Sequence, residues 1–218
     1  MTMNRAFPYK LFLTLLLCLL PLSGRCGEAG ENGARAAGLH PRLEWGIGET
    51  FYRYHSYNFD SQEGYRIRGE LKGADFFTNA EVYAGVDWVM GKHFSTSATA
   101  GLCGIYRHSR CIPVNIRINY YTSSFYNDSA VVFLQAGTGI KTRASVQKNA
   151  LFLVAAGGGY HFSLTRSGTA LDLLLRVQGS SDHPDLVNPE SSGTVEKRNI
   201  RKNDAYYCAL NFSIALSF

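Results

Sequence analysis

The segment AYYCALNFSIALSF, residues 205–218, decides the fold class. Its even-numbered positions carry apolar side chains, namely Tyr206, Cys208, Leu210, Phe212, Ile214, Leu216 and Phe218. Its odd-numbered positions carry alanine, serine, asparagine and one tyrosine. Successive side chains of a β-strand point to opposite faces, so one face of this strand is continuously apolar and the other is small or polar. The segment therefore predicts a β-strand with two contrasting faces.

The same alternation recurs along the chain in segments of about 10 to 14 residues. The eight segments lie near 42–55, 76–90, 94–107, 112–122, 130–141, 151–164, 169–179 and 205–218. Tilted strands need about 9–11 residues to cross a bilayer, whereas strands of soluble proteins typically have about 5 or 6. A closed barrel leaves no unpaired strand edge in lipid, and bacterial outer-membrane barrels have even strand numbers. The sequence therefore predicts an all-β fold, an eight-stranded antiparallel up-and-down transmembrane β-barrel.

The N-terminal region has the pattern of a secretory signal. Arg5 and Lys10 precede the apolar run LFLTLLLCLLPL, residues 11–22, which is too short for a comfortable membrane-spanning helix. We expect a signal peptide at 1–26, a flexible periplasmic lead-in at 27–40 and the barrel at 41–218. Without residues 1–26, the net charge of +5 falls to +2, with 19 bases against 17 acids. The high isoelectric point therefore does not support a nucleic-acid partner.

Loop lengths and aromatic side chains predict an orientation in the outer membrane. The first, third, fifth and seventh connections are longer on average, as outer loops are, although the third (108–111) is short and the fourth (123–129) is long. Aromatic residues fall near strand ends on the apolar face, which is typical of the two membrane interfaces. We expect Trp88, Phe94, Tyr120, Phe162 and Phe218 at the periplasmic interface, and Phe51, Tyr106, Phe152 and Tyr206 at the outer one. Both termini then lie in the periplasm.

Residues 41–218 resemble the small eight-stranded outer-membrane barrels, the OmpA/OmpX-like and OmpW-like group. The resemblance rests on FSTSATAGLCGIYRHSRCIPVNIRINYYTSS (94–124), FLQAGTGIKT (133–142), LFLVAAGGGYHFSLT (151–165) and the aromatic C-terminus. It implies contacts with outer-membrane lipids and lipopolysaccharide. It also implies recognition by the barrel assembly machinery through Phe212, Ile214, Leu216 and Phe218. That class includes stabilisers, adhesins, solute conduits and lipid-modifying enzymes, so the resemblance indicates architecture rather than activity.

The predicted inward face carries charged side chains, which are Glu44, Glu81, Asp87, Arg117, Asp172 and Arg176. Buried charges persist only when they are paired and hydrogen-bonded. An eight-stranded barrel has an interior just wide enough for side chains. We therefore expect a plug of salt bridges, and the alternative is a gated polar conduit.

Two His-x-Ser units suggest an enzyme: His93 with Ser95, and His161 with Ser163. Lipid A deacylases of the outer membrane use a neighbouring histidine and serine. Both units here face the lumen near the periplasmic end, away from outer-leaflet lipid, and Thr96 and Leu164 occupy the places of that family's Ser-Asn pair. We therefore expect no catalytic residue. We also expect no cofactor, and no metal-ligand spacing is evident.

Two outer connections carry basic residues. In the seventh, Lys197, Arg198, Arg201 and Lys202 suit the phosphates of lipopolysaccharide, although a solvated hairpin, with Glu196 and Asp204 offsetting the charge, explains them slightly better. In the first (56–75), aromatic side chains lie beside bases, and we favour an extension of the first hairpin over a ligand site.

Strand parity leaves two local questions. If the third hairpin turns near Ser109, Cys103 and Cys111 lie about 13 Å apart, too far for a disulfide. Strict alternation puts Glu49 and Arg53 on the lipid face, unless a bulge near Gly46 or Gly48 turns them inward or both lie at the wet rim.

The sequence thus favours a non-enzymatic outer-membrane barrel with a plugged lumen and a structural or surface-interaction role. One alternative is a lipid A-modifying enzyme or a narrow conduit for small solutes. Another is a soluble lipocalin-like carrier, in which the apolar face would turn inward around a ligand.

Overall fold

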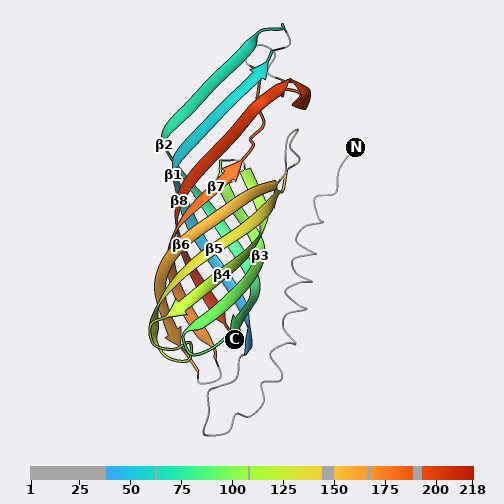
Figure 1. The fold of residues 1–218 in the computed structure, drawn as a ribbon. Coiled ribbons are helices and arrows are strands. Elements are labelled where there is room, and N and C mark those ends of the chain that lie inside the picture. Colours follow the sequence, from blue (N-terminus) through green and yellow to red (C-terminus); the bar gives the residue numbers. More distant parts are fainter. Residues whose placement is uncertain (1–37, 62, 108, 144–149, 166–167, 189–192) are drawn as a thin grey trace.

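The computed structural model describes residues 38–218 except 62, 108, 144–149, 166–167 and 189–192, and this part of the chain is all-β (Figure 1). The predicted signal peptide and most of the lead-in lie outside the described residues. The strands are β1 (Leu39–Asp60), β2 (Arg66–Val89), β3 (Phe94–Tyr106), β4 (Ser109–Tyr121), β5 (Ser129–Lys141), β6 (Ala150–Ser163), β7 (Ala170–Asp182) and β8 (Ile200–Ser217). A 3₁₀ turn, η2 (Lys197–Asn199), precedes β8. Within the described ranges, no helix has the length and apolar character needed to cross a membrane.

The eight strands form one closed sheet. Each strand pairs antiparallel with its neighbours in the chain, and β1 also pairs with β8, so the order is β1 to β8 around a closed barrel. From Arg42, a path through the paired residue on each successive strand returns to β1 at Arg53. The strands are therefore strongly staggered, as the closure of a sheet requires. The predicted eight-stranded, antiparallel, up-and-down architecture is confirmed.

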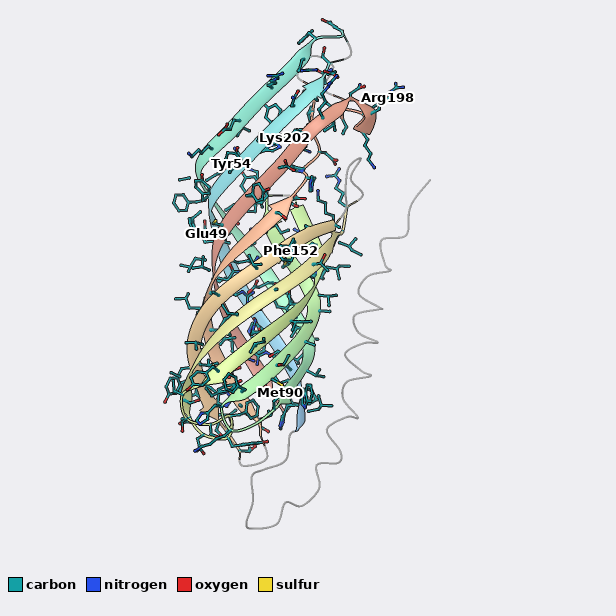
Figure 2. All side chains as sticks on the ribbon, in the orientation of Figure 1. Glu49, Tyr54, Met90, Phe152, Arg198 and Lys202 are labelled. Atoms are coloured by element: carbon teal, nitrogen blue, oxygen red, sulfur yellow. The ribbon has the colours of Figure 1, made fainter. Side chains whose placement is uncertain are left out.

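The inward face of the sheet is polar and the outward face is apolar, which is the reverse of the usual arrangement around a protein core. On β4 the inward residues Asn115, Arg117 and Asn119 are at most 3% exposed, whereas the outward Ile116 and Ile118 are 59% and 54% exposed. The same alternation places apolar side chains on the outside of the other strands (Figure 2). We call this outward surface the apolar belt. It includes Trp45, Ile47, Val82, Trp88, Phe94, Leu102, Ile112, Val114, Val132, Leu134, Ile140, Phe152, Val154, Leu175, Val177, Leu210 and Phe212.

Three strands continue beyond one end of the ring (Figure 1). The pairing of β2 with β3 begins only at Glu81, and that of β8 with β7 only at Ala205. Beyond these points β1, β2 and β8 pair only with one another among the described residues, and we call them the outer extension. The predicted extension of the first hairpin is therefore confirmed. β2 begins ten residues earlier than the expected 76, at Arg66, and β8 begins at 200 instead of 205.

An apolar cluster on the inward side explains the length of these strands. Phe59 of β1 packs there with Leu186 and Val195, two residues that precede β8 in the chain. Tyr57, Ile67 and Ile200 pack against them. Because the connection after β7 supplies two members of the cluster, the sequence pattern within the first hairpin gives no sign of it.

We refer to the opposite end of the barrel, where β1 starts and β8 stops, as the terminus end.

The structure corrects several local expectations. The bulge in β1 lies between Thr50 and Tyr52 instead of near Gly46 or Gly48. It turns Arg53 to the inward side, whereas Glu49 stays outside and accepts a hydrogen bond from Thr78. Tyr106, expected on the outer aromatic girdle, is only 7% exposed because a register shift after Gly104 turns it inward.

Two boundaries also differ from the prediction. Leu39 and His40, expected in a flexible lead-in, belong to β1, where they pair with Trp88 and Asp87. In the third hairpin Cys103 lies directly opposite Cys111, because the chain turns around Arg107 instead of Ser109. The expectation of 13 Å between these cysteines is therefore wrong.

Candidate functional site

The centre of the lumen is a carboxylate held by three arginines. Glu44 of β1 lies 2.8 Å from Arg117 Nη1 and 2.7 Å from Arg176 Nη1, and 3.3 Å from Arg42 Nη2. A serine hydroxyl, that of Ser213, donates a further hydrogen bond to Oε1. Glu44 is 1% exposed, so these partners replace water for both of its oxygens. The arginines come from β1, β4 and β7, so this one carboxylate links strands from around the ring.

The other three carboxylates, Asp87, Asp172 and Glu81, pair with Arg42 and Arg176, which also contact Glu44. Arg42 contacts Asp87 at 2.9 Å and Asp172 at 2.8 Å, and Arg176 contacts Glu81 at 2.6 Å. Neutral side chains complete the set: Gln135 accepts from Arg117, Asn211 donates to Glu81, and Ser217 donates to Asp87. We call this the lumen network.

All six lumen residues expected from the sequence lie in this network, and each is at most 4% exposed. The sequence analysis missed Arg42, although it stands two positions before Glu44 and so belongs to the same face of the strand. Strand alternation alone would therefore have placed Arg42 in the lumen.

His161 completes the charge balance at the terminus end. Its Nδ1 lies 2.5 Å from Asp172 Oδ1, and its Nε2 lies 2.6 Å from the backbone oxygen of Phe125. Both neighbours are acceptors, so only the doubly protonated ring donates to both. In that form His161 and three arginines carry four positive charges against the four carboxylates of the network. Charge neutrality is what a buried cluster requires.

Apolar layers close the lumen on both sides of the network. At the terminus end Phe125, in the connection between β4 and β5, is 1% exposed and packs with Val89, Tyr121, Val131, Phe133 and Leu174. This accounts for the length of the fourth connection, which folds back over the opening. At the other end a second cluster contains Tyr83, Cys103, Ile105, Tyr106, Cys111, Leu151, Leu153, Ala205 and Tyr207.

The lumen and the two His-x-Ser units are the places where the sequence allows a conduit or an enzyme. Asp87 is 0% exposed, so bulk water does not reach this carboxylate from either end of the described barrel. His161 contacts Asp172 instead of Ser163, whose hydroxyl donates to the Tyr126 backbone oxygen. His93 contacts the backbone oxygen of Tyr121. Neither His-x-Ser unit therefore forms a hydrogen-bonded base and nucleophile, and no metal-binding cluster of His, Cys, Asp and Glu occurs in the part of the chain that the structure describes.

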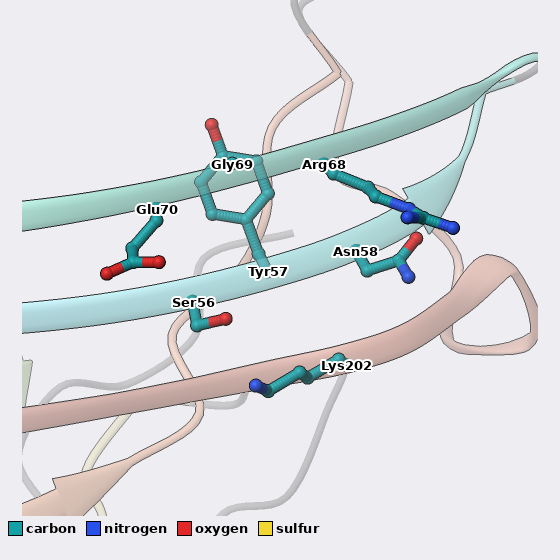
Figure 3. Close-up of a pocket in the computed structure, with 7 residues that line it drawn as sticks. All are labelled: Ser56, Tyr57, Asn58, Arg68, Gly69, Glu70 and Lys202. Atoms are coloured by element: carbon teal, nitrogen blue, oxygen red, sulfur yellow. The ribbon is translucent and has the colours of Figure 1, made fainter.

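The outer extension carries a hollow of about 560 Å³. Strands β1, β2 and β8 all contribute to it, and Figure 3 shows Arg68 and Lys202 on either side of Ser56 and Asn58, with Glu70 nearby. By strand alternation, Arg68 and Lys202 lie on the same side of the sheet as the exposed Tyr206, and therefore as the apolar belt. The hollow thus continues the outward surface beyond the belt.

Three of the four bases predicted to contact lipopolysaccharide, Lys197, Arg201 and Lys202, line a second hollow of about 280 Å³ beside His183. Arg198 pairs with Glu196 at 2.6 Å, and Arg201 pairs with Asp60 at 2.9 Å. The hydrogen bond from Arg201 lowers the pKa of the Asp60 carboxyl. Lys197 lies in η2, and of the four bases only Lys202 also lines the hollow of about 560 Å³, where it joins Arg68. Arg68 belongs to the predicted first connection (56–75), which is far from Lys202 in the sequence.

The lumen network predicts a large effect for Glu44→Gln. The amide keeps the shape but removes the one anion shared by three buried guanidinium groups. Breaking a buried ion pair costs about 3–5 kcal/mol, so we expect a fall of that order in the free energy of unfolding. Urea titration followed by tryptophan fluorescence measures it. The matched control is Glu49→Gln on the outer side, which should change stability by less than about 1 kcal/mol. Equal effects at the two positions would contradict the central role of Glu44.

Comparison with known proteins names no relative. No protein-family model matches the sequence, and no curated protein matches it.

Proposed function

We propose that the protein is an integral outer-membrane β-barrel, similar to the small eight-stranded class, whose sealed lumen is structural and whose outer extension serves surface interactions. The observation that carries this proposal is the apolar belt. Apolar side chains such as Ile116, Leu134 and Phe152, which are 59%, 68% and 53% exposed, surround a ring whose interior holds charges.

The cost of exposing so much apolar surface to water supports a bilayer around this belt. Monomeric soluble proteins rarely expose contiguous apolar patches larger than a few hundred Å². A closed β-sheet satisfies every backbone group of the spanning region internally, as hydrocarbon requires. A soluble lipid carrier needs an apolar interior, and here the interior is the lumen network. The soluble carrier is therefore the weaker proposal.

The orientation in this proposal follows from the two ends of the barrel. The terminus end, with the short connection between β2 and β3, faces the periplasm, and the outer extension faces outside. The expected signal peptide supplies export, and the alternating residues from Phe212 to Phe218 supply the assembly signal.

A structural role fits the lumen better than catalysis or transport. A conduit needs a wetted path, and an enzyme needs a reactive group that its substrate reaches. The charged groups of the lumen network pair with one another behind two apolar layers, although Asp87 Oδ1 and Arg176 Nε have no hydrogen-bond partner among the described residues. We therefore propose a non-enzymatic protein, and function is to be sought on the outside.

Envelope fractionation tests the proposal directly. We expect the protein in the outer-membrane fraction, with a gel band that migrates faster in the unboiled sample because the closed sheet resists detergent. A soluble periplasmic band without a heat shift would sink the proposal.

A charged substitution on the belt tests contact with lipid. Ile116→Arg should lower the free energy of unfolding from lipid vesicles by about 2–4 kcal/mol if the side chain faces the bilayer midplane. The matched control is Val187→Arg, because Val187 is 60% exposed but lies between β7 and β8, beyond the belt. The control should have little effect. Equally small effects at both positions would place the belt in water.

For the outer extension, we propose contact with the phosphates of lipopolysaccharide through Arg68 and Lys202. The support is position: both side chains lie beyond the belt and on its side of the sheet, where the headgroups of the outer leaflet would be. Basic side chains near an anionic membrane surface contribute about 1 kcal/mol each.

Binding of purified lipopolysaccharide to the detergent-solubilised protein measures this contribution. Replacing Arg68 and Lys202 by glutamine should weaken binding about fivefold for each charge removed, and 0.5 M salt should weaken it in the wild type. Lys92→Gln, at the exposed terminus end, is the matched control and should bind as the wild type does. Unchanged affinity in the double variant would exclude these two residues.

A further inference from the structure

We infer that Cys103 and Cys111 form an intrachain disulfide in the exported protein. The two residues are direct partners across β3 and β4, and their Sγ atoms lie 3.2 Å apart in the thiol form. Residues directly opposite in an antiparallel pair have Cα atoms about 4.5–5.5 Å apart, which lies within the range that a disulfide spans. Small side-chain rotations therefore suffice to join the sulfurs.

The surroundings favour a single, protected bond. Cys103 is 3% exposed and Cys111 is 0% exposed, within the apolar layer that closes the lumen below the outer extension. The third described cysteine, Cys208, pairs with Gly179 on β7 and with Tyr52 on β1, so no alternative partner lies beside it across the strands. Wrong pairing would need β8 to leave the sheet.

The bond would hold the turn that supports the outer extension. This turn contains Arg107 at a φ of 43°, a left-handed conformation that is costly for a residue with a β-carbon. Tyr106 donates a hydrogen bond to Asp75 of β2, and Arg107 Nη2 lies 3.6 Å from the same carboxylate. Arg53 of β1 donates to the Tyr106 hydroxyl. Closing the hairpin at Cys103 and Cys111 therefore fixes the residues that brace β1 and β2 where they leave the ring.

The chemistry is a two-electron oxidation by exchange. One cysteine thiolate attacks a sulfur of an oxidised thiol–disulfide oxidoreductase, or of oxidised glutathione, to give a mixed disulfide and a leaving thiolate. The second cysteine thiolate then attacks the cysteine sulfur of the mixed disulfide and displaces the second thiolate. The two cysteines lose two protons and two electrons, and the oxidant becomes two thiols. The periplasm sustains such oxidation, so this inference rests on the export in the proposed function.

Peptide mass spectrometry tests the bond on the full chain. Protein from the heat-shifted outer-membrane band is denatured in the presence of N-ethylmaleimide, which blocks free thiols at once, and is then digested with trypsin. Arg107 and Arg110 lie between the two cysteines, so a disulfide joins peptide 93–107 to peptide 111–117. We expect this linked pair, its loss after reduction, and maleimide on Cys208 alone. Cys208→Ser should keep the linked pair, and Cys111→Ser should release Cys103 to the label.

The two proposals fail in distinguishable ways. Maleimide on both Cys103 and Cys111 in protein from the outer-membrane band would overturn the disulfide and leave the barrel in place. If the protein is not found in that fraction, the barrel proposal fails, and purified protein refolded from denaturant in the presence of oxidised glutathione then tests the geometry, because the thiols are accessible until the sheet closes over them. Absence of the linked pair after that oxidation would overturn the disulfide as well.

A second measurement tests the structural consequence. Hydrogen exchange should be faster at residues 104–107 and 72–77 in the Cys103→Ser/Cys111→Ser variant than in the oxidised wild type, with no difference at 150–163. Unchanged exchange in the turn would show that the bond does not brace the extension.

Discussion

The burial of Glu44 among three guanidinium groups is the constraint on which the barrel depends. A carboxylate removed from water is tolerated only when it is paired and hydrogen-bonded, and here its partners come from β1, β4 and β7. A slip of one residue in any of these strands would send its charged side chain to the apolar outer face. The lumen network therefore specifies the register of the sheet, in addition to whatever stability it contributes.

The two apolar layers give the lumen network its strength. Phe125 closes one side and the cluster around Tyr207 closes the other, so the ion pairs act in a medium of low polarizability, where they are stronger than in water. The same exclusion of water makes any unpaired charge costly, and both ring nitrogens of His161 lie within hydrogen-bond distance of an acceptor. A barrel built in this way has a fixed shape, and charged side chains fill the middle of its lumen.

Alternation within single strands made the ring, the strand number and most of the lumen network predictable. Ile116 and Arg117, for example, show their opposite faces in the sequence itself. The errors arose where one strand's conformation depends on another segment. The bulge after Thr50 depends on β8 and β2, and the early start of β2 at Arg66 depends on Leu186 and Val195. The position of the turn in the third hairpin was predicted wrongly because Arg107 adopts a left-handed backbone conformation, which an arginine in the sequence does not indicate.

The outer extension inherits its order from the barrel, because its three strands remain paired with one another on both sides of the bulge after Thr50. It also leaves one edge of β2 without a partner strand among the described residues, from Arg66 to Ala80. Unpaired edges invite self-association, and charged side chains oppose it. Arg68, Glu70 and Lys72 alternate along this edge and point to the outward side. Arg68 and Glu70 also line the hollow. Arg68 therefore opposes self-association at the edge and, in our proposal, also contacts the anionic surface below.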